Sequence, residues 1–465
     1  MKHRADILVV LGHVLLVRNY VADGFLRELV TRGLKVAVIA PDDTHPFIRQ
    51  LAPGLVALYP LSRYRPRRPR MWVLRHLRLG SFFARRTASA YALKLAFNRR
   101  LALDKRLAIG FWERMARVTD PEKLAKKWAS ALRPRRAALR LIREVSPRIV
   151  VWPTTISDPV DFEVVQAARL LRVPVVMCEG SWDNLVCKGA IWPRPGRLLV
   201  WGELSRNFAR DEHGFTDAEI GVTGPPHFGV YNRVEDLMPR DEWLRRHDLD
   251  PARRVIFVAG TTIGRLVEPT LVHVISSLID SGDLPPSYVW YRPHPKVGDR
   301  FEGARCRDDP NVRIDPGVDN AHPTTGMNRI IDARETRQRA EAIAACDLIV
   351  SMFSTVVLEG ALLGKPSILV DPESLEGSSS RPASSSQNYK HVQYLLRSPW
   401  IRLAPNLDAL QPMLHEFLSL DPRSYAQPLR AFAQQVVCCG IESSQDRIVR
   451  DVQDCLVRLT TEAAH

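Results

Sequence analysis

Short apolar runs alternate along this chain with segments in which apolar residues recur every three or four positions. The apolar runs predict buried strands over Ile7–Leu11, Val36–Ile39, Ile149–Trp152, Val173–Cys178, Leu198–Trp201, Ile220–Thr223, 253–260, Tyr288–Tyr291, Val312–Ile314, Asp347–Val350 and Ser367–Val370. The helical spacing predicts helices over Val21–Thr31, Phe162–Leu171, Ser205–His213, Thr270–Leu278, Glu335–Cys346, Val356–Leu363, 406–418 and 425–460. Because continuous apolar strands that alternate with amphipathic helices are typical of parallel sheets covered on both faces, the pattern predicts an α/β fold.

A length of 465 residues suits two domains with separate cores. Gly224-Pro225-Pro226 predicts a stiff exit from the first, so we expect domains over 1–230 and 231–430. A last helix within 431–465 is expected to pack back on the first domain. The N-terminal apolar run follows a basic start, as in a signal peptide, but no small-residue cleavage site follows it. We interpret it as the first strand.

Composition adds little to this picture. Hydrophobic residues make up 45% of the chain and charged residues 25%, and no run approaches the roughly 18–20 apolar residues of a membrane span. Seven cysteines occur without a C-x-x-C motif, which predicts a reduced, cytoplasmic protein without a zinc site or disulfide framework. We interpret Cys438-Cys439 as a pair inside a helix.

Positive charge is concentrated in one segment, residues 63–143. It holds 24 Lys and Arg against 4 Asp and Glu, a net of +20, so the rest of the +15 chain carries −5. Aromatic residues interleave with these cations, which predicts a basic helical insertion that lies on an anionic membrane surface. Contact with a nucleic acid backbone and a merely solvated basic face are the alternatives. No DNA- or RNA-binding module accompanies the segment, so we expect no nucleic acid partner.

Polar residues follow two strands of the first half. In an open α/β sheet such residues meet at one edge, where ligands bind. The candidates are His13, Arg18 and Asn19 after the first strand, and Glu179, Ser181, Asp183, Asn184 and Lys188 after the strand that ends near Cys178. Structural roles remain open for two of them, because His13 can bond to nearby backbone and Asp183 can hold its turn as an Asx residue.

Three strand ends of the second half carry groups that suit an anion. Hydroxyls, backbone N–H groups and a fixed cation together fit a diphosphate. The candidates are Thr261, Thr262, Arg292, His294, Lys296, Ser351, Ser354, Thr355 and Glu359. The alternative is that the hydroxyls of 351–355 only cap a helix. Neither GxxxxGK[ST] nor GxGxxG occurs, which disfavours a P-loop NTPase or an NAD enzyme.

Five motifs carry a resemblance to a known family. They are WGELS (201–205), VTGPPHF (222–228), YRPHPK (291–296), DLIVSMFSTVVLEGALLGKPSI (347–368) and SWDNLVCKG (181–189). They resemble the GT-B glycosyltransferases of bacterial surface polysaccharide assembly, especially the branch related to CDP-glycerol glycerophosphotransferases. The resemblance implies two Rossmann-like domains facing a cleft, with the nucleotide donor on the second. It also implies that His294 contacts donor phosphate, that Ser354 and Thr355 hold the diphosphate, and that Glu359 binds ribose.

Such a transferase stabilises a leaving nucleoside diphosphate and, if it inverts, needs a base for the acceptor hydroxyl. We expect the base among Asp183, Glu179 and His13, in that order. No D-x-D motif ends a strand, so we expect neither a metal nor a cofactor, with the nucleotide-activated donor as substrate. The sequence leaves retention or inversion of configuration, and the oligomeric state, open.

The predicted function is transfer of a sugar from a nucleotide donor to a glycan or lipid-linked glycan acceptor, on the inner face of the cytoplasmic membrane. Three alternatives stand beside it. The first is transfer of a polyol phosphate from a CDP-alcohol. The second is a nucleotide-sugar epimerase, for which the basic segment would have no use. The third is a non-catalytic nucleotide- or glycan-binding protein.

Overall fold

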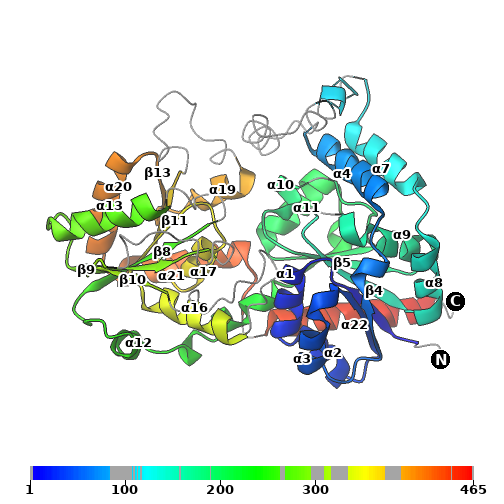
Figure 1. Ribbon diagram of the computed structural model, residues 1–465, viewed down its shortest axis with the longest axis horizontal. Coiled ribbons are helices and arrows are strands. Elements are labelled where there is room, and N and C mark those ends of the chain that lie inside the picture. The colour runs from blue at the N-terminus through cyan, green and yellow to red at the C-terminus, as the bar shows by residue number, and fades with distance from the viewer. Residues whose placement is uncertain are drawn as a thin grey trace. The chain divides into compact units, whose positions relative to one another are not determined.

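The computed structural model describes two units, each built on a parallel sheet (Figure 1). The first comprises Met1–Gly229 and Val436–His465, and the second Val230–Gln435. The described residues are 4–83, 107, 110–112, 114–115, 118–156, 159–188, 190–261, 268–294, 308–315, 333–371, 389–440 and 442–462.

The first unit holds a seven-stranded sheet in the order β3-β2-β1-β4-β5-β6-β7, and every neighbouring pair is parallel. Its strands are β1 (Ile7–Val10), β2 (Val36–Ala40), β3 (Ala57–Pro60), β4 (Ile149–Thr154), β5 (Val175–Glu179), β6 (Arg197–Val200) and β7 (Ile220–Val222). Its described α-helices are α1 (Val14–Val17), α2 (Phe25–Thr31), α3 (His45–Leu51), α4 (Arg68–Phe83), α7 (Pro121–Ala131), α8 (Arg136–Val145), α9 (Phe162–Leu170), α10 (Asn184–Cys187), α11 (Glu203–His213) and α22 (Ser444–Glu462), with a π-helical turn at Arg18–Ala22.

Both faces of this sheet are buried, as its continuous apolar strands require. Leu8 and Val10 point into a core that contains α8 and α9, whereas Ile7 and Val9 point into a second core on the opposite face. Helix α22 contributes Ile448, Val449 and Val452 to that second core, and Figure 1 shows it in red among the blue N-terminal elements. The end of the chain thus completes the first unit.

The basic segment has two structural parts. Helices α4 and α7 pack together around Leu74, Trp112 and Ala129, and meet the body of the unit at Phe162 and Trp192. Helix α8, at the end of the segment, instead supplies sheet-facing residues to the main core. The insertion therefore ends before α8, which is the ordinary helix of the crossover into β4.

The second unit holds a six-stranded parallel sheet in the order β10-β9-β8-β11-β12-β13. Its strands are β8 (Arg254–Ala259), β9 (Ser287–Arg292), β10 (Val312–Ile314), β11 (Leu348–Ser351), β12 (Ser367–Val370) and β13 (Ile401–Ala404). Its helices of six or more residues are α12 (Arg240–Arg246), α13 (Glu268–Asp280), α16 (Ala333–Ala345), α17 (Val356–Leu362), α19 (Lys390–Leu395), α20 (Leu407–Ser419) and α21 (Pro422–Val436). One core joins α13 and α20 to the same face of this sheet.

The predicted fold class is confirmed, since both sheets are parallel and flanked by helices. The pattern analysis missed two edge strands, β3 (ALYP) and β13 (IRLA), in which half of the residues or more are only half-buried. It also wrongly predicted one helix over 425–460. Helix α21 ends at Val436 and α22 begins at Ser444, so Cys438-Cys439 lies in the connection and not inside a helix. In the described part of the chain, no helix is long and apolar enough to span a membrane.

Candidate functional site

The ends of β9, β8 and β11 lie against one another at the carboxyl edge of the second sheet. The Gly260 N–H donates to the Arg292 carbonyl at 2.8 Å, and the Ser351 hydroxyl donates to the Ala259 carbonyl at 3.3 Å. A Cβ on Gly260 would lie 2.6 Å from the His294 nitrogen. Only glycine fits this contact, so the polypeptide after β8 and the polypeptide after β9 are held together.

A buried carboxylate, Glu268, fixes the turn after β8. It accepts from the Thr261 N–H at 2.5 Å and from the Tyr291 hydroxyl at 3.0 Å. Burial raises the pKa of this carboxyl, and the two donors partly offset that effect. The Thr261 hydroxyl donates to the Met352 sulfur at 3.5 Å, which links this turn to the one after β11. Thr261 is buried, so here it joins two turns of the site.

Arg292 is buried and bound to two carboxylates of its own unit. Its guanidinium lies 2.6 Å from Asp315 Oδ2, after β10, and 3.2 Å from Glu335 Oε1, on α16. Sequence reasoning assigned Arg292 to a phosphate and missed both carboxylates. In this geometry its charge is already neutralised by protein groups, and it orders the strand ends from within.

Glu359 is likewise buried and bound to its own unit. Its Oε2 accepts from the Tyr231 hydroxyl at 2.5 Å and lies 2.9 Å from Arg339 Nε. Burial raises the pKa of Tyr231, and the adjacent Glu359 carboxylate raises it further. The sequence spacing correctly put Glu359 one helical turn after Thr355, but it carried no signal for Tyr231 or Arg339.

Three predicted residues of this edge remain partly exposed: His294 after β9, and Ser354 and Thr355 before α17. The Ser354 hydroxyl accepts from the Val356 N–H at 3.4 Å, a long bond of the capping kind. Thr262 and Lys296 lie outside the described residues. Among the described residues predicted for this edge, His294, Ser354 and Thr355 are thus the ones whose side chains reach solvent.

The carboxyl edge of the first sheet contains a different kind of buried acid. Glu179, at the end of β5, is 2% exposed, and its Oε2 accepts from the Trp201 N–H at 3.1 Å. Within the described residues, its Oε1 has no hydrogen-bond partner. Burial raises the pKa of Glu179 to about 8, although the Trp201 N–H opposes the shift. At neutral pH this group is therefore mainly a carboxylic acid.

The turn after β5 carries the other predicted residues of this strand end. Asp183 precedes α10, and its carboxylate lies 3.8 Å from the Lys188 ammonium and accepts from the Asn184 side-chain amide at 3.2 Å. Asn184 is buried, whereas Ser181 is half-buried and a quarter of the Asp183 side chain is exposed. Asp183 is thus the more accessible of the two acids.

After β1, the predicted residues His13 and Arg18 each form a hydrogen bond within their own turn. His13 caps α1, where its Nδ1 accepts from the Leu15 N–H at 3.1 Å. That bond assigns the ring proton of neutral His13 to Nε2, which can then donate but not accept. Arg18 donates to the buried Asn19 amide oxygen at 2.8 Å. The structure favours Asp183 over His13 as a proton acceptor.

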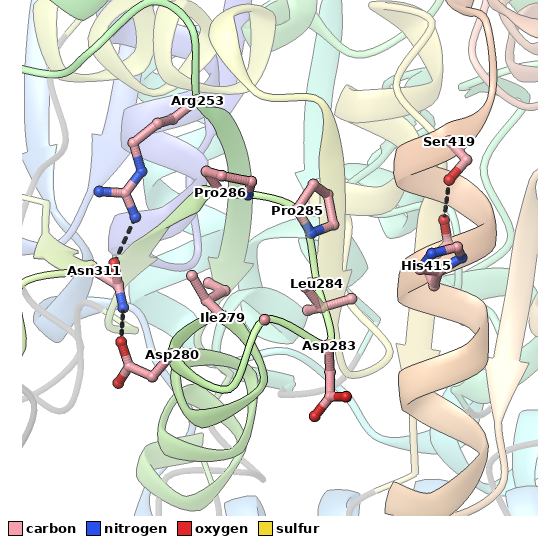
Figure 2. Close-up of a pocket in the computed structure, with 11 residues that line it drawn as sticks. Arg253, Ile279, Asp280, Asp283, Leu284, Pro285, Pro286, Asn311, His415 and Ser419 are labelled. Atoms are coloured by element: carbon pink, nitrogen blue, oxygen red, sulfur yellow. Dashed lines mark hydrogen bonds between the residues drawn. The ribbon is translucent and has the colours of Figure 1, made fainter.

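A cavity of about 570 Å³ lies at the opposite, amino edge of the second sheet. Figure 2 shows its main polar chain, in which Arg253 donates to Asn311 at 2.5 Å and Asn311 donates to Asp280 at 2.6 Å. Ser419 donates to the His415 carbonyl within α20. These groups satisfy one another, and ligands of open α/β sheets bind at the other edge. We assign this cavity no role.

No three or more His, Cys, Asp or Glu side chains lie together as a metal-binding set within the described residues. The six described cysteines are free thiols.

No protein-family model and no curated protein sequence matches this chain. Solved structures do match its fold. A glycosyltransferase from Rickettsia africae superposes with a TM-score of 0.52 at 11% identity, over 98% of this chain and 99% of that one. The calicheamicin glycosyltransferase CalG4 gives 0.51 at 13%, over 98% and 99%. A UDP-GlcNAc 2-epimerase of Methanocaldococcus jannaschii gives 0.50 at 13%, over 96% and 99%. These likenesses establish a GT-B type fold.

Proposed function

We propose that this protein is a glycosyltransferase that moves a sugar from a nucleotide donor to a surface-glycan acceptor, lipid-linked and at the membrane surface. Its fold is shared with two solved glycosyltransferases. The observation that carries the proposal is the common edge of β9, β8 and β11. There, the partly exposed His294, Ser354 and Thr355 follow strands whose ends are in direct contact.

These three groups suit a leaving nucleoside diphosphate. An imidazole N–H and two hydroxyls donate hydrogen bonds to phosphate oxygens, and such bonds strengthen as negative charge develops. Arg292 and Glu359 hold the surrounding elements in place, because each forms ion pairs within the unit. We assign acceptor deprotonation to Asp183. Glu179 keeps its own proton at neutral pH, and the neutral His13 ring has no free acceptor nitrogen.

The donor half of the proposal is tested by nucleotide binding. Thermal shift and calorimetry with UDP, CDP and CMP should show that at least one of them stabilises the wild type. His294→Ala should weaken that binding at least about tenfold, since a hydrogen bond to a charged group contributes about 1.5–3 kcal/mol. His273→Ala, on the exposed side of α13, is the matched control. If no nucleotide binds, the donor site does not exist.

The proton-acceptor half is tested by turnover. Asp183→Asn should keep nucleotide binding and lose at least about a hundredfold in turnover, the usual contribution of a general base. Asp217→Asn is the control, because that carboxylate lies in the same unit and is mostly exposed. Undiminished turnover in Asp183→Asn would remove this residue from the mechanism.

The membrane half is supported by the surface of the basic segment. Six of the eight large hydrophobic residues that are exposed in the described chain belong to 63–143, among them Trp72, Phe111 and Trp128. Exposed aromatic rings among cations are typical of surfaces that lie on anionic lipid. A purely solvated basic face would have no reason to expose them.

A second candidate is a nucleotide-sugar epimerase, because the solved UDP-GlcNAc 2-epimerase of Methanocaldococcus jannaschii shares this fold. Incubation with a nucleotide sugar and no acceptor separates the two functions. An epimerase would accumulate the epimeric sugar, whereas a transferase would leave the donor unchanged. The binding measurements with UDP, CDP and CMP address polyol-phosphate transfer from a CDP-alcohol. For that function, CDP should bind better than UDP.

A further inference from the structure

Five arginines line one cavity of the first unit. They are Arg67, Arg70, Arg135, Arg136 and Arg140, and the cavity has a volume of about 560 Å³. Pro69 and Ala137 complete its lining, and no carboxylate contributes to it. We call it the arginine cavity. Its volume lies within the range of sites for small ligands.

A buried glutamate fixes two walls of this cavity. Glu163 is fully buried, and its Oε1 lies 2.8 Å from Arg70 Nε while its Oε2 accepts from the Arg135 N–H at 2.7 Å. Arg70 also donates to the Arg133 carbonyl at 2.6 Å, and Arg135 to the Arg65 carbonyl at 2.8 Å. The backbones that carry the arginines are therefore held in place, as a binding site requires.

The other three arginines have no such partners. Among the described residues, no hydrogen bond or ion pair involves the guanidinium of Arg67, Arg136 or Arg140, and all three side chains are exposed. Helices α4 and α8 both begin at this cavity, and neither has an acidic residue in its first turn. Helix N-termini favour anions, so cations gathered there repel both the helix dipoles and one another. An anionic ligand would remove that repulsion.

The position of the cavity is also informative. Arg67 follows β3, and α8 runs from the cavity back to the start of β4, so the cavity lies at the carboxyl edge of the first sheet. Trp72 and Val73 follow Pro69 by three and four residues on α4, hence on the same side, and their side chains are 53% and 39% exposed. An apolar surface thus continues from the rim of a cationic cavity.

We propose that the arginine cavity binds a phosphate or diphosphate group, of the kind that joins a lipid to its headgroup. Guanidinium groups bind phosphate oxygens in pairs, and the adjacent Trp72 and Val73 suit the apolar part of such a ligand. The inference does not depend on the proposed function, because the cavity is formed by the first unit alone.

The test compares two double variants of the full-length protein that each remove two exposed positive charges. Arg136→Gln with Arg140→Gln changes the cavity, and Arg143→Gln with Arg169→Gln changes arginines of the same unit that do not line it. Inorganic pyrophosphate is titrated calorimetrically at physiological salt. Vesicles of phosphatidylcholine, with and without phosphatidylglycerol, are co-sedimented under the same conditions. Circular dichroism checks that both variants fold.

The cavity double variant should bind pyrophosphate at least about tenfold more weakly than wild type, and the control double within about twofold. If the cavity double variant also fails to co-sediment with anionic vesicles while the control double variant still does, the phosphate belongs to a lipid. If only pyrophosphate binding falls, the ligand is a soluble phosphate compound. Equal behaviour of the two double variants toward both probes overturns the proposal.

UDP binding by the same variants separates this inference from the proposed function. We expect it to be unchanged in both. A wild type that binds no UDP would defeat the proposed donor site, whereas the pyrophosphate and vesicle results would still decide the arginine cavity.

Discussion

Each unit buries a glutamate near the carboxyl edge of its sheet, Glu179 at the end of β5 and Glu359 in α17, and the two differ in how their charge is compensated. In the second unit, Glu359 lies 2.9 Å from Arg339 and accepts from Tyr231, so its charge is compensated inside the protein. In the first unit, the Trp201 N–H and the Ser205 side chain form hydrogen bonds with Glu179, but no cation pairs with it among the described residues, and burial raises its pKa to about 8.

The difference separates a carboxylate whose charge is compensated from one whose ionised form is disfavoured. A buried and compensated carboxylate stabilises a fold only while its partners are present. Burial without compensating groups destabilises the ionised form of a carboxylate and raises its pKa. Such shifted pKa values are common at functional sites. Glu359 therefore belongs to the framework of the second unit, whereas Glu179 is a buried acid near the partly exposed Asp183.

Removing the partner of Glu359 should have the largest effect. Arg339→Ala leaves a buried charge without compensation, and we expect the free energy of unfolding to fall by about 3–5 kcal/mol. Denaturant unfolding measures it. Arg337→Ala, on the same helix, removes a half-exposed arginine that pairs with Glu341 and should cost at most about 1 kcal/mol. Equal losses of stability in the two variants would mean that the buried Arg339–Glu359 ion pair contributes no more than the half-exposed Arg337–Glu341 pair.

The second prediction concerns the tight packing of the first edge. A Cβ on Gly180 would lie 2.6 Å from the Thr154 carbonyl oxygen, and the backbone there cannot yield cheaply. Gly180→Ala should destabilise the protein by about 1–3 kcal/mol and displace Glu179. Gly196→Ala, whose Cβ would have its nearest neighbour at 3.9 Å, is the control. A Gly180 variant as stable as the control would show that this strand end has room to move.

The third prediction concerns how the stability of the protein depends on pH. Unfolded glutamate releases its proton near pH 4.5, whereas folded Glu179 holds it up to about pH 8. Between these values the folded state binds the extra proton, so stability falls as pH rises, by about 1.4 kcal/mol per pH unit. Glu179→Gln should make this slope shallower, as unfolding measured from pH 5 to 8 would show, while Glu268, whose pKa is also raised by burial, keeps its own contribution. Glu203→Gln, mostly exposed, should keep the wild-type slope. Parallel curves for wild type and Glu179→Gln would refute the buried-acid interpretation.

The smallest change in stability is expected when the ion pair of the partly exposed Asp183 is removed. Lys188→Ala removes the ammonium 3.8 Å from Asp183, and both side chains reach solvent. We expect a stability change below about 1 kcal/mol, because partly exposed ion pairs contribute little. A larger loss in denaturant unfolding would place Asp183 with the structural acids, next to Glu359.

Much of the fold was predictable because strand and helix periodicity is local. Val312–Ile314 and Ser367–Val370 were predicted with the bounds that the structure gives. The strand-end residues were predictable as a set, since parallel strands of one sheet end at a common edge. The edge strands β3 and β13 were not, because β3 ends in a proline and β13 is interrupted by the charged Arg402.

By itself, the sequence determined the two parallel sheets, their carboxyl edges and the residues that follow each strand. The tertiary structure alone decided which of those residues are neutralised. Tyr231 lies 128 positions from Glu359, and Glu335 lies 43 from Arg292, so no local pattern announces either pair. Secondary structure depends on neighbours in the sequence, whereas the state of a buried charge depends on groups that only folding brings within a few ångströms.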